Sequence, residues 1–117
     1  MFENRDNFKS FLKNSPCDVT ILKFTASWCG PCKKIEPIVK QLLEKHNGKS
    51  FRYYEIDVDE CFDTYAFFKK KRMINGIPAF CVYYNSKYEE DTFYVPHHIV
   101  TGANPEMIQQ LFDQVLR

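Results

Sequence analysis

The stretch Trp28-Cys29-Gly30-Pro31-Cys32 decides how this chain of 117 residues is organised. It follows an apolar run, Val19 to Ala26, that predicts a buried strand, and it precedes helical spacing of apolar residues from Ile35 to Leu43. Two cysteines separated by two residues at a strand-to-helix turn are typical of a redox-active pair. A thiolate at Cys29 would lie beside the unpaired N–H groups of the first helical turn, which favour negative charge. Because the thiolate is the attacking species, this placement predicts a reactive Cys29.

Composition predicts a soluble globular chain, with 44% apolar and 26% charged residues. The net charge of +1 gives no strong attraction to nucleic acid or to a membrane surface, so we expect neither as a partner. No apolar run approaches the roughly 20 residues that a membrane-spanning helix needs. The length suits one core, and we expect a single domain over residues 1–117.

The cysteines and the N-terminus suggest a reducing compartment. Residues 1–6 lack the apolar centre of a signal peptide, so we expect a cytoplasmic protein. In such a compartment a CxxC pair is more often catalytic or metal-binding than structural. Five cysteines are an odd number, so a closed disulfide framework cannot include all of them. Structural zinc needs four ligands, and no second CxxC or suitably spaced histidine pair occurs, so we expect no metal.

Hydrophobic spacing and turn residues predict eight elements. We expect helices over residues 2–13, 33–46, 61–71 and 105–116, and strands over residues 19–25, 51–58, 79–84 and 92–95, with an irregular stretch or interrupted strand over 96–102. Helical crossovers imply parallel pairing of the early strands, and the turn at Asn85-Ser86-Lys87 implies an antiparallel pair. The result is an α/β fold, with a mixed four-stranded sheet flanked by helices on both faces.

Local signals refine the helices. Pro37 should bend the second helix, and Asp59 can cap the third. Asn104-Pro105-Glu106 supplies a cap, a first-turn proline and an acid for the last helix. The side chains expected to be buried on the last two helices are Phe62, Tyr65, Ala66, Phe68, Met107, Ile108, Leu111, Phe112, Val115 and Leu116.

The longer stretch Phe24-Thr25-Ala26-Ser27-Trp28-Cys29-Gly30-Pro31-Cys32-Lys33 resembles the active-site segment of thioredoxins. Further matches, which extend the resemblance to roughly residues 19–116, are Pro37, Asp57-Val58-Asp59, Gly76-Ile77-Pro78 and Thr101-Gly102-Ala103. A lone CxxC would be a weak signal, but this string with a downstream Ile-Pro is specific. The resemblance implies the thioredoxin fold and a thiol–disulfide oxidoreductase that reduces or exchanges protein disulfides.

The resemblance also implies how the pair would work. Cys29 would be the exposed nucleophile that attacks a substrate disulfide, and Cys32 would resolve the mixed disulfide. Gly30 and Pro31 would let the turn form and start the helix. Trp28 would shield the site and offer an apolar docking surface.

Two more segments would bind substrate by the same resemblance. Pro78, if cis, would place the backbone of Ile77 beside the sulfurs, where it can pair with an extended substrate segment. Gly102 would leave room for that segment. The resemblance further implies protein disulfide substrates, a thioredoxin-reductase-like electron donor and no bound cofactor, and we expect a monomer.

The sequence departs from the family at Lys23, where thioredoxins usually hold a buried Asp. We expect Lys23 to pair with Glu36, since a lone buried ammonium is costly. A cation near the pair favours thiolates, which predicts a more oxidising couple than that of Asp-bearing relatives. Alternatively, the Lys23 stem crosses the core and its amine reaches water. A second departure is length: the hairpin region Tyr84 to Gly102 is longer than usual and could alter partner choice.

Several alternatives remain open. The chain could be a non-catalytic binding module or accessory subunit, or a more oxidising oxidase or isomerase-like exchanger. Cys61 is a candidate redox sensor, whereas Cys17 and Cys81 are expected to be inert. The run Lys69-Lys70-Lys71-Arg72 fits a solvated helix end favoured by the dipole, with a docking patch for an acidic partner as the second interpretation.

Overall fold

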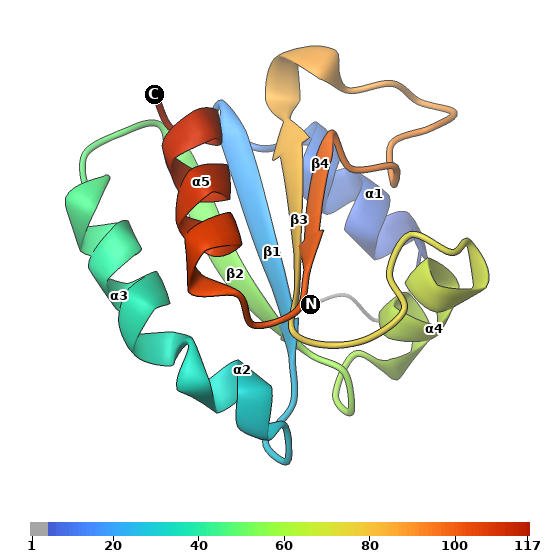
Figure 1. Ribbon diagram of the computed structural model, residues 1–117. Coiled ribbons are helices and arrows are strands. Elements are labelled where there is room, and N and C mark those ends of the chain that lie inside the picture. The colour runs from blue at the N-terminus through green and yellow to red at the C-terminus, as the bar shows by residue number, and fades with distance from the viewer. Residues whose placement is uncertain (1–4) are drawn as a thin grey trace.

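The computed structural model describes residues 5–117 (Figure 1). Its elements in chain order are α1 (Arg5–Lys13), β1 (Val19–Thr25), α2 (Gly30–Lys34), α3 (Glu36–Lys45), β2 (Phe51–Asp57), α4 (Phe62–Lys70), β3 (Ala79–Tyr84), a 3₁₀ turn η1 (Asn85–Lys87), β4 (His98–Thr101) and α5 (Pro105–Val115). The part of the expected first helix before residue 5 lies outside the described residues.

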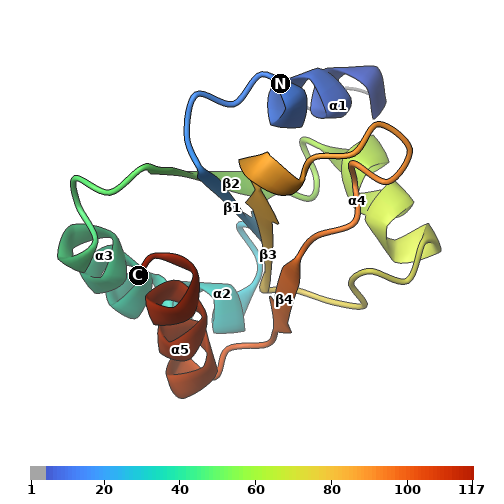
Figure 2. The same cartoon turned by 90° about the horizontal axis from the view of Figure 1, so that it is seen from above.

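The sheet has the order β2-β1-β3-β4. β1 pairs in parallel with β2, and the pairs β1–β3 and β3–β4 are antiparallel. Figure 2 shows α1 and α4 on one face of the sheet and α2, α3 and α5 on the other. The predicted mixed four-stranded sheet with helices on both faces is therefore confirmed.

The central strand β1 is buried on both sides, and this explains its continuous apolar sequence. Side chains alternate along a strand, so Val19 and Ile21 pack into the cluster formed with α3 and α5. Leu22 and Phe24 pack into the opposite cluster, which contains Phe68 of α4. These two buried clusters, one on each face of β1, fix the strand in the middle of the sheet and so fix the position of its carboxyl end.

The helix after β1 is interrupted at the place where the sequence predicted a bend. α2 ends at Lys34 and α3 begins at Glu36, with Ile35 between them. Pro37 has no N–H to continue the helical hydrogen bonds, so the chain bends here. The short α2 can therefore point its N-terminus at the sheet end while α3 packs along the sheet.

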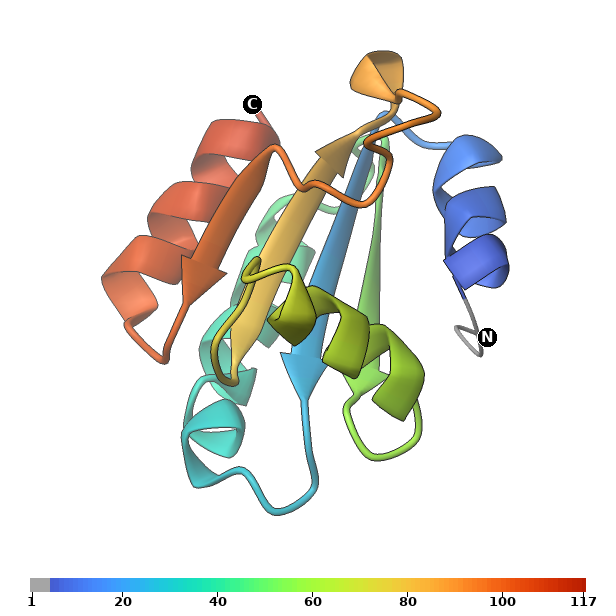
Figure 3. The same ribbon diagram turned by 90° about the vertical axis from the view of Figure 1, so that its right-hand side faces the viewer.

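Four chain segments meet at one end of the sheet (Figure 3). The carboxyl ends of β1, β2 and β4 and the start of β3 all lie there, because β1 and β2 are parallel and β3 runs against both neighbours. The β1–α2 turn, the β2–α4 loop, the segment before β3 and the β4–α5 turn are thereby brought together. The topology thus gathers residues that are far apart in the sequence.

The expected strand over residues 92–95 is wrong. The fourth strand is His98–Thr101, inside the stretch for which an interrupted strand was the alternative. Residues 92–95 form a turn in which the Val95 N–H donates to the Thr92 carbonyl. Phe93 is buried 6.3 Å from the ring of Phe8, measured between centroids, because this segment folds over α1 rather than extending the hairpin.

Three local expectations about side chains also fail. Phe62 and Met107 are 65% and 47% exposed rather than buried. Asp59 does not cap α4, which has Cys61 as its N-cap without a side-chain hydrogen bond. Instead the Asp57 carboxylate accepts from the Asp59 and Glu60 N–H groups at 2.8 and 3.3 Å. The Asp59 side chain is thereby free for another contact, described below.

The last helix begins as predicted. The Asn104 side chain accepts from the N–H groups of Glu106 and Met107 at 3.0 and 3.2 Å. Among residues 5–117, no helix has the length and apolar character needed to cross a bilayer.

Phe68 and Phe62 provide a matched test of the packing on α4. Phe68 is fully buried and its ring lies 4.9 Å from that of Phe24, so Phe68→Ala should lower the free energy of unfolding by about 3–5 kcal/mol. The exposed Phe62→Ala should change it by less than about 0.5 kcal/mol. Denaturant unfolding of both variants measures the difference, and equal losses would contradict this packing.

Candidate active site

The first turn of α2 holds the cysteine pair. Cys29 is the N-cap of α2, in an extended conformation, and its Sγ accepts a hydrogen bond from the Cys32 N–H at 3.1 Å. Cys29 and Cys32 form a disulfide with their Cα atoms 5.3 Å apart. The contact predicted from the sequence, between the outer sulfur and the open N–H groups of the helix, is therefore present.

The expectation that Cys29 is exposed is wrong for the disulfide form. Cys29 is 4% exposed and Cys32 is fully buried. The neighbours Trp28, Gly30 and Pro31 are exposed, so the outer sulfur lies just beneath the surface of an accessible turn. Little of the Cys29 side chain is therefore directly accessible in the disulfide form.

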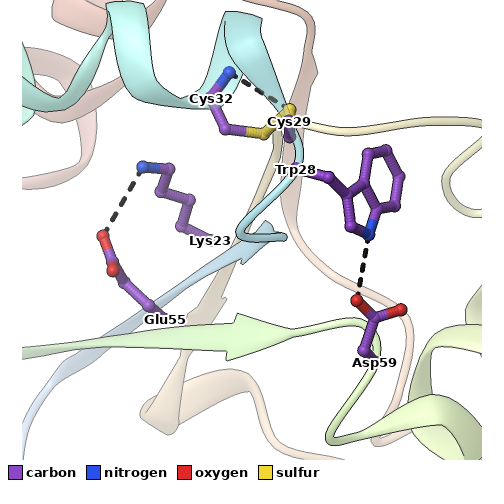
Figure 4. The surroundings of a disulfide bond; sticks show 6 residues. All are labelled: Lys23, Trp28, Cys29, Cys32, Glu55 and Asp59. Carbon is purple, nitrogen blue, oxygen red and sulfur yellow. Dashed lines mark hydrogen bonds and ion pairs between the residues drawn. A yellow bond between two sulfur atoms is a disulfide. The ribbon is translucent and has the colours of Figure 1, made fainter.

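Trp28 stands at the edge of this turn, 67% exposed. Its indole Nε1 donates to the Asp59 carboxylate at 2.9 Å, which links the β1–α2 turn to the β2–α4 loop (Figure 4). The sequence predicted Asp59 as a helix cap, and its hydrogen bond to Trp28 was not predicted. The hydrogen bond holds one end of the indole and leaves the ring face exposed.

The segment before β3 lies at the same end of the sheet as the cysteine turn. The Ile77–Pro78 peptide bond is cis, as the resemblance implies. The Gly102 N–H donates to the Pro78 carbonyl at 2.8 Å, and this hydrogen bond joins the β4–α5 turn to the proline. Gly102 has φ of +104°, a conformation that L side chains rarely adopt, and a Cβ built there meets no heavy atom within 4 Å. The backbone thus requires glycine, and the space beside it is open.

Comparison with known proteins agrees with this geometry. The family model described as Thioredoxin matches residues 1–111. The chain belongs to the thioredoxin family. A thioredoxin from Ictalurus punctatus is 32% identical over 108 residues, covering 92% of this chain and 90% of that protein. A thioredoxin from Coprinus comatus is 27% identical over 116 residues, covering 99% and 96%.

The solved structures give the same answer for the fold. The oxidised thioredoxin from Plasmodium falciparum superposes with a TM-score of 0.68 at 26% identity, covering 98% of this chain and 95% of the other. The protein has the thioredoxin fold and, with its Cys29–Cys32 pair at the start of α2, is a thiol–disulfide oxidoreductase.

Within this thioredoxin site, Lys23 is buried with 1% of its side chain exposed. The alternative in which its amine reaches water is therefore wrong. The expected pair with Glu36 is also wrong: the Lys23 Nζ lies 3.5 Å from the Glu55 carboxylate. Lys23 and Glu55 are cross-strand neighbours in the β1–β2 register, which explains the pairing. Figure 4 shows this pair on one side of the disulfide and Trp28 with Asp59 on the other.

Glu55 has a second donor, the Tyr53 hydroxyl at 2.9 Å. Burial and the nearby Glu55 charge raise the pKa of Tyr53 well above its ordinary value, so the phenol stays a donor. Glu36 is the first residue of α3 and lines a surface hollow with Tyr53 and Glu55. Glu36 therefore adds negative charge beside this network without pairing with Lys23.

The other three cysteines are free thiols. Cys81 is fully buried on β3, and burial raises its pKa to about 12, so it is a protonated, unreactive thiol at neutral pH. Cys17 and Cys61 are half-buried. Among residues 5–117, no three metal-binding side chains come together, and zinc binding therefore gains no support.

Removing the carboxylate and removing the ammonium of the Lys23–Glu55 pair should have opposite effects on the free energy of unfolding. Glu55→Gln leaves a buried ammonium without its carboxylate and should lower the free energy of unfolding by about 1–2 kcal/mol, reduced by the 48% exposure of the Glu55 side chain. Lys23→Met removes the buried charge and should be neutral or stabilising. Denaturant unfolding measures both, and a greater loss in Lys23→Met would contradict a buried ion pair.

Proposed function

We propose that this thioredoxin-family protein is a protein-disulfide reductase in which Cys29 attacks and Cys32 resolves. The observation that carries the proposal is the Cys32 N–H donating to the Cys29 sulfur at the start of α2. The same N–H and the helix dipole favour a thiolate at Cys29 once the disulfide is reduced. Cys32, one turn deeper and fully buried, is protected from competing substrates.

The first step forms a mixed disulfide. The Cys29 thiolate attacks one sulfur of the substrate disulfide, so a new S–S bond forms and the substrate S–S bond breaks. The departing substrate sulfur carries the electron pair away as a thiolate and takes a proton. Because Cys29 is only 4% exposed, the substrate is expected to present its disulfide on an exposed segment.

The second step releases the product. The Cys32 sulfur, after loss of its proton, attacks the Cys29 sulfur, the Cys29–Cys32 disulfide forms, and the second substrate thiolate leaves. In total the protein loses two electrons and the substrate gains two electrons and two protons. A dithiol electron donor of the thioredoxin-reductase kind would return the protein to its reduced form, and no bound cofactor is needed.

We propose that the substrate segment docks on Trp28, Ile77, Pro78 and Gly102. The exposed indole offers an apolar surface, and the backbone beside the cis proline offers hydrogen bonds to an extended chain. The open space at Gly102 supports the same arrangement. Gly30 and Pro31 form the turn that presents the sulfur, and Glu36 starts the helix behind it.

We also propose that Lys23 makes the couple more oxidising than that of relatives with Asp at this position. A buried ammonium in the strand leading to the cysteine turn favours thiolates and so stabilises the reduced protein. This would suit disulfide exchange as well as reduction.

We propose a domain organisation, an oligomeric state and a cellular location as well. The chain acts as one domain over residues 1–117, as a monomer, in the cytoplasm. Three free thiols alongside one disulfide support a reducing compartment.

Insulin-disulfide reduction tests the enzyme directly. Wild type should be active, and Cys29→Ser should lose about 10³-fold or more because no nucleophile remains. Cys32→Ser should accumulate a covalent mixed disulfide, visible by non-reducing mass spectrometry. A folded but inactive wild type would favour the binding-module alternative, and trapping by Cys29→Ser in place of Cys32→Ser would reverse the order of attack.

The reduction potential tests Lys23. Lys23→Met should make the potential more negative by about 15–30 mV, equivalent to about half to one pKa unit of thiolate stabilisation. Glu55→Gln should shift it in the opposite direction, since the ammonium is then less neutralised. Titration against glutathione measures both, and a Lys23→Met potential equal to or above that of wild type would reject the coupling.

A further inference from the structure

The basic run at the end of α4 borders a hollow that the redox chemistry does not use. The hollow has a volume of about 470 Å³ and is lined by Lys69, Arg72, Met73, Ile74, Asn75 and Thr101. Its lining contains two cations, an amide and a hydroxyl but no carboxylate. A site of this composition is suited to an anionic group.

The two cations are available to a ligand. Among residues 5–117, no carboxylate lies within salt-bridge distance of Lys69 or Arg72, and both residues are exposed. The Lys69 ammonium lies 5.4 Å above the ring of Tyr65, which limits where it can point. Arg72 has φ of +59°, at a position after the helix where glycine is the usual residue. Arginine does not stabilise this backbone conformation, so the presence of Arg72 here is better explained by a role for its side chain.

The hollow adjoins the segments proposed to bind substrate. Asn75 stands two residues before Ile77, and Thr101 pairs with Ala79 and immediately precedes Gly102. In Figure 3, α4 slants across the sheet so that its carboxyl end lies toward β3 and β4, and the chain then descends to the start of β3. A polypeptide lying along the cis-proline segment would therefore pass the hollow.

The side of the cysteine turn near Trp28 carries negative charge, in contrast to the positive charge of the hollow. Asp59 lies against Trp28, Asp57 is the last residue of β2, and Glu60 belongs to the β2–α4 loop. An acidic substrate side chain would be repelled on the Trp28 side and attracted on the Lys69 side. The negative side near Trp28 and the positive hollow near Lys69 together favour one orientation of the substrate. In that orientation, an Asp or Glu beside the substrate cysteine lies at the hollow.

We propose that this hollow, named here the α4 hollow, receives a carboxylate side chain of the polypeptide whose disulfide Cys29 attacks. The inference rests on the proposed reductase function and adds a preference for substrates with an Asp or Glu a few residues from the reacting cysteine. The redox step itself is unchanged, because the carboxylate only positions the substrate. If the basic run served only to complement the helix dipole, Lys69 and Arg72 would affect substrate preference no more than Lys70 and Lys71 do.

The test uses disulfide peptides that differ at one residue, Glu or Gln, placed in turn at each position flanking the cysteine. The reduced full-length protein is mixed with each peptide, and the exchange rate is followed by the fluorescence of Trp28, the single tryptophan of the chain. At one or more positions wild type should react about threefold faster with the Glu peptide, and the ratio should fall toward one at high salt.

Two double variants separate the hollow from the general charge of the helix end. Lys69→Gln with Arg72→Gln should bring the Glu-to-Gln rate ratio to about one and leave the rate with the Gln peptide unchanged. Lys70→Gln with Lys71→Gln removes the same charge from the same run, outside the hollow, and should keep the threefold ratio.

An equal loss of preference in both double variants, or no preference in wild type at any position, would overturn the α4 hollow while leaving the reductase intact. No exchange with either peptide would overturn the reductase proposal itself, and the two failures are therefore distinguishable.

Discussion

The chemistry proposed for this site depends on the hydrogen bond from the Cys32 N–H to the Cys29 sulfur. This contact requires a helix that begins immediately after Cys29, aimed outward at the end of the sheet. The bend before Pro37 lets α2 take that direction while α3 packs on the sheet. The buried strand β1 holds the turn in place from below, because both of its faces are packed. The chemistry is thus set by backbone geometry that the core enforces.

Burial of the outer sulfur is the basis of the selectivity proposed for this site. Cys29 is 4% exposed, so the proposed partner has to fit the surface around it. That surface is built from the exposed ring of Trp28, the cis Ile77–Pro78 segment and the open space at Gly102. The Lys23–Glu55 ion pair lies to one side of the disulfide. In the proposed mechanism, shape and charge around the sulfur select which disulfides react, and the helix start favours the attacking thiolate.

Local signals in the sequence were sufficient for most of the fold. The β1 strand, the Pro37 bend and the Asn104 cap each depend on residues within a few positions, and each is confirmed. The cysteine pair followed from its spacing at a strand-to-helix turn, whereas the cis proline followed only from the resemblance. These features could be predicted because the information that fixes them lies close together in the chain.

Several of the errors concern placement that depends on tertiary packing. Lys23 pairs with Glu55 because the β1–β2 register places them opposite each other, and no local pattern sets that register. Phe62 is exposed because the buried face of α4 carries Thr64 and Phe68, and helical spacing places Phe62 on another side of the helix. Residues 92–95 failed as a strand because Phe93 is drawn into the core beside Phe8, which competes with extended pairing. In each case tertiary packing overrides the local preference.

The most direct test of the central contact is the pH dependence of iodoacetamide alkylation of the fully reduced protein, with the modified cysteine identified by peptide mapping. We expect Cys29 to be alkylated first, with a reaction pKa below the roughly 8.5 of free cysteine, because the helix start stabilises its thiolate. Alkylation of Cys29 with the pKa of a free cysteine, or of Cys61 ahead of it, would contradict the account.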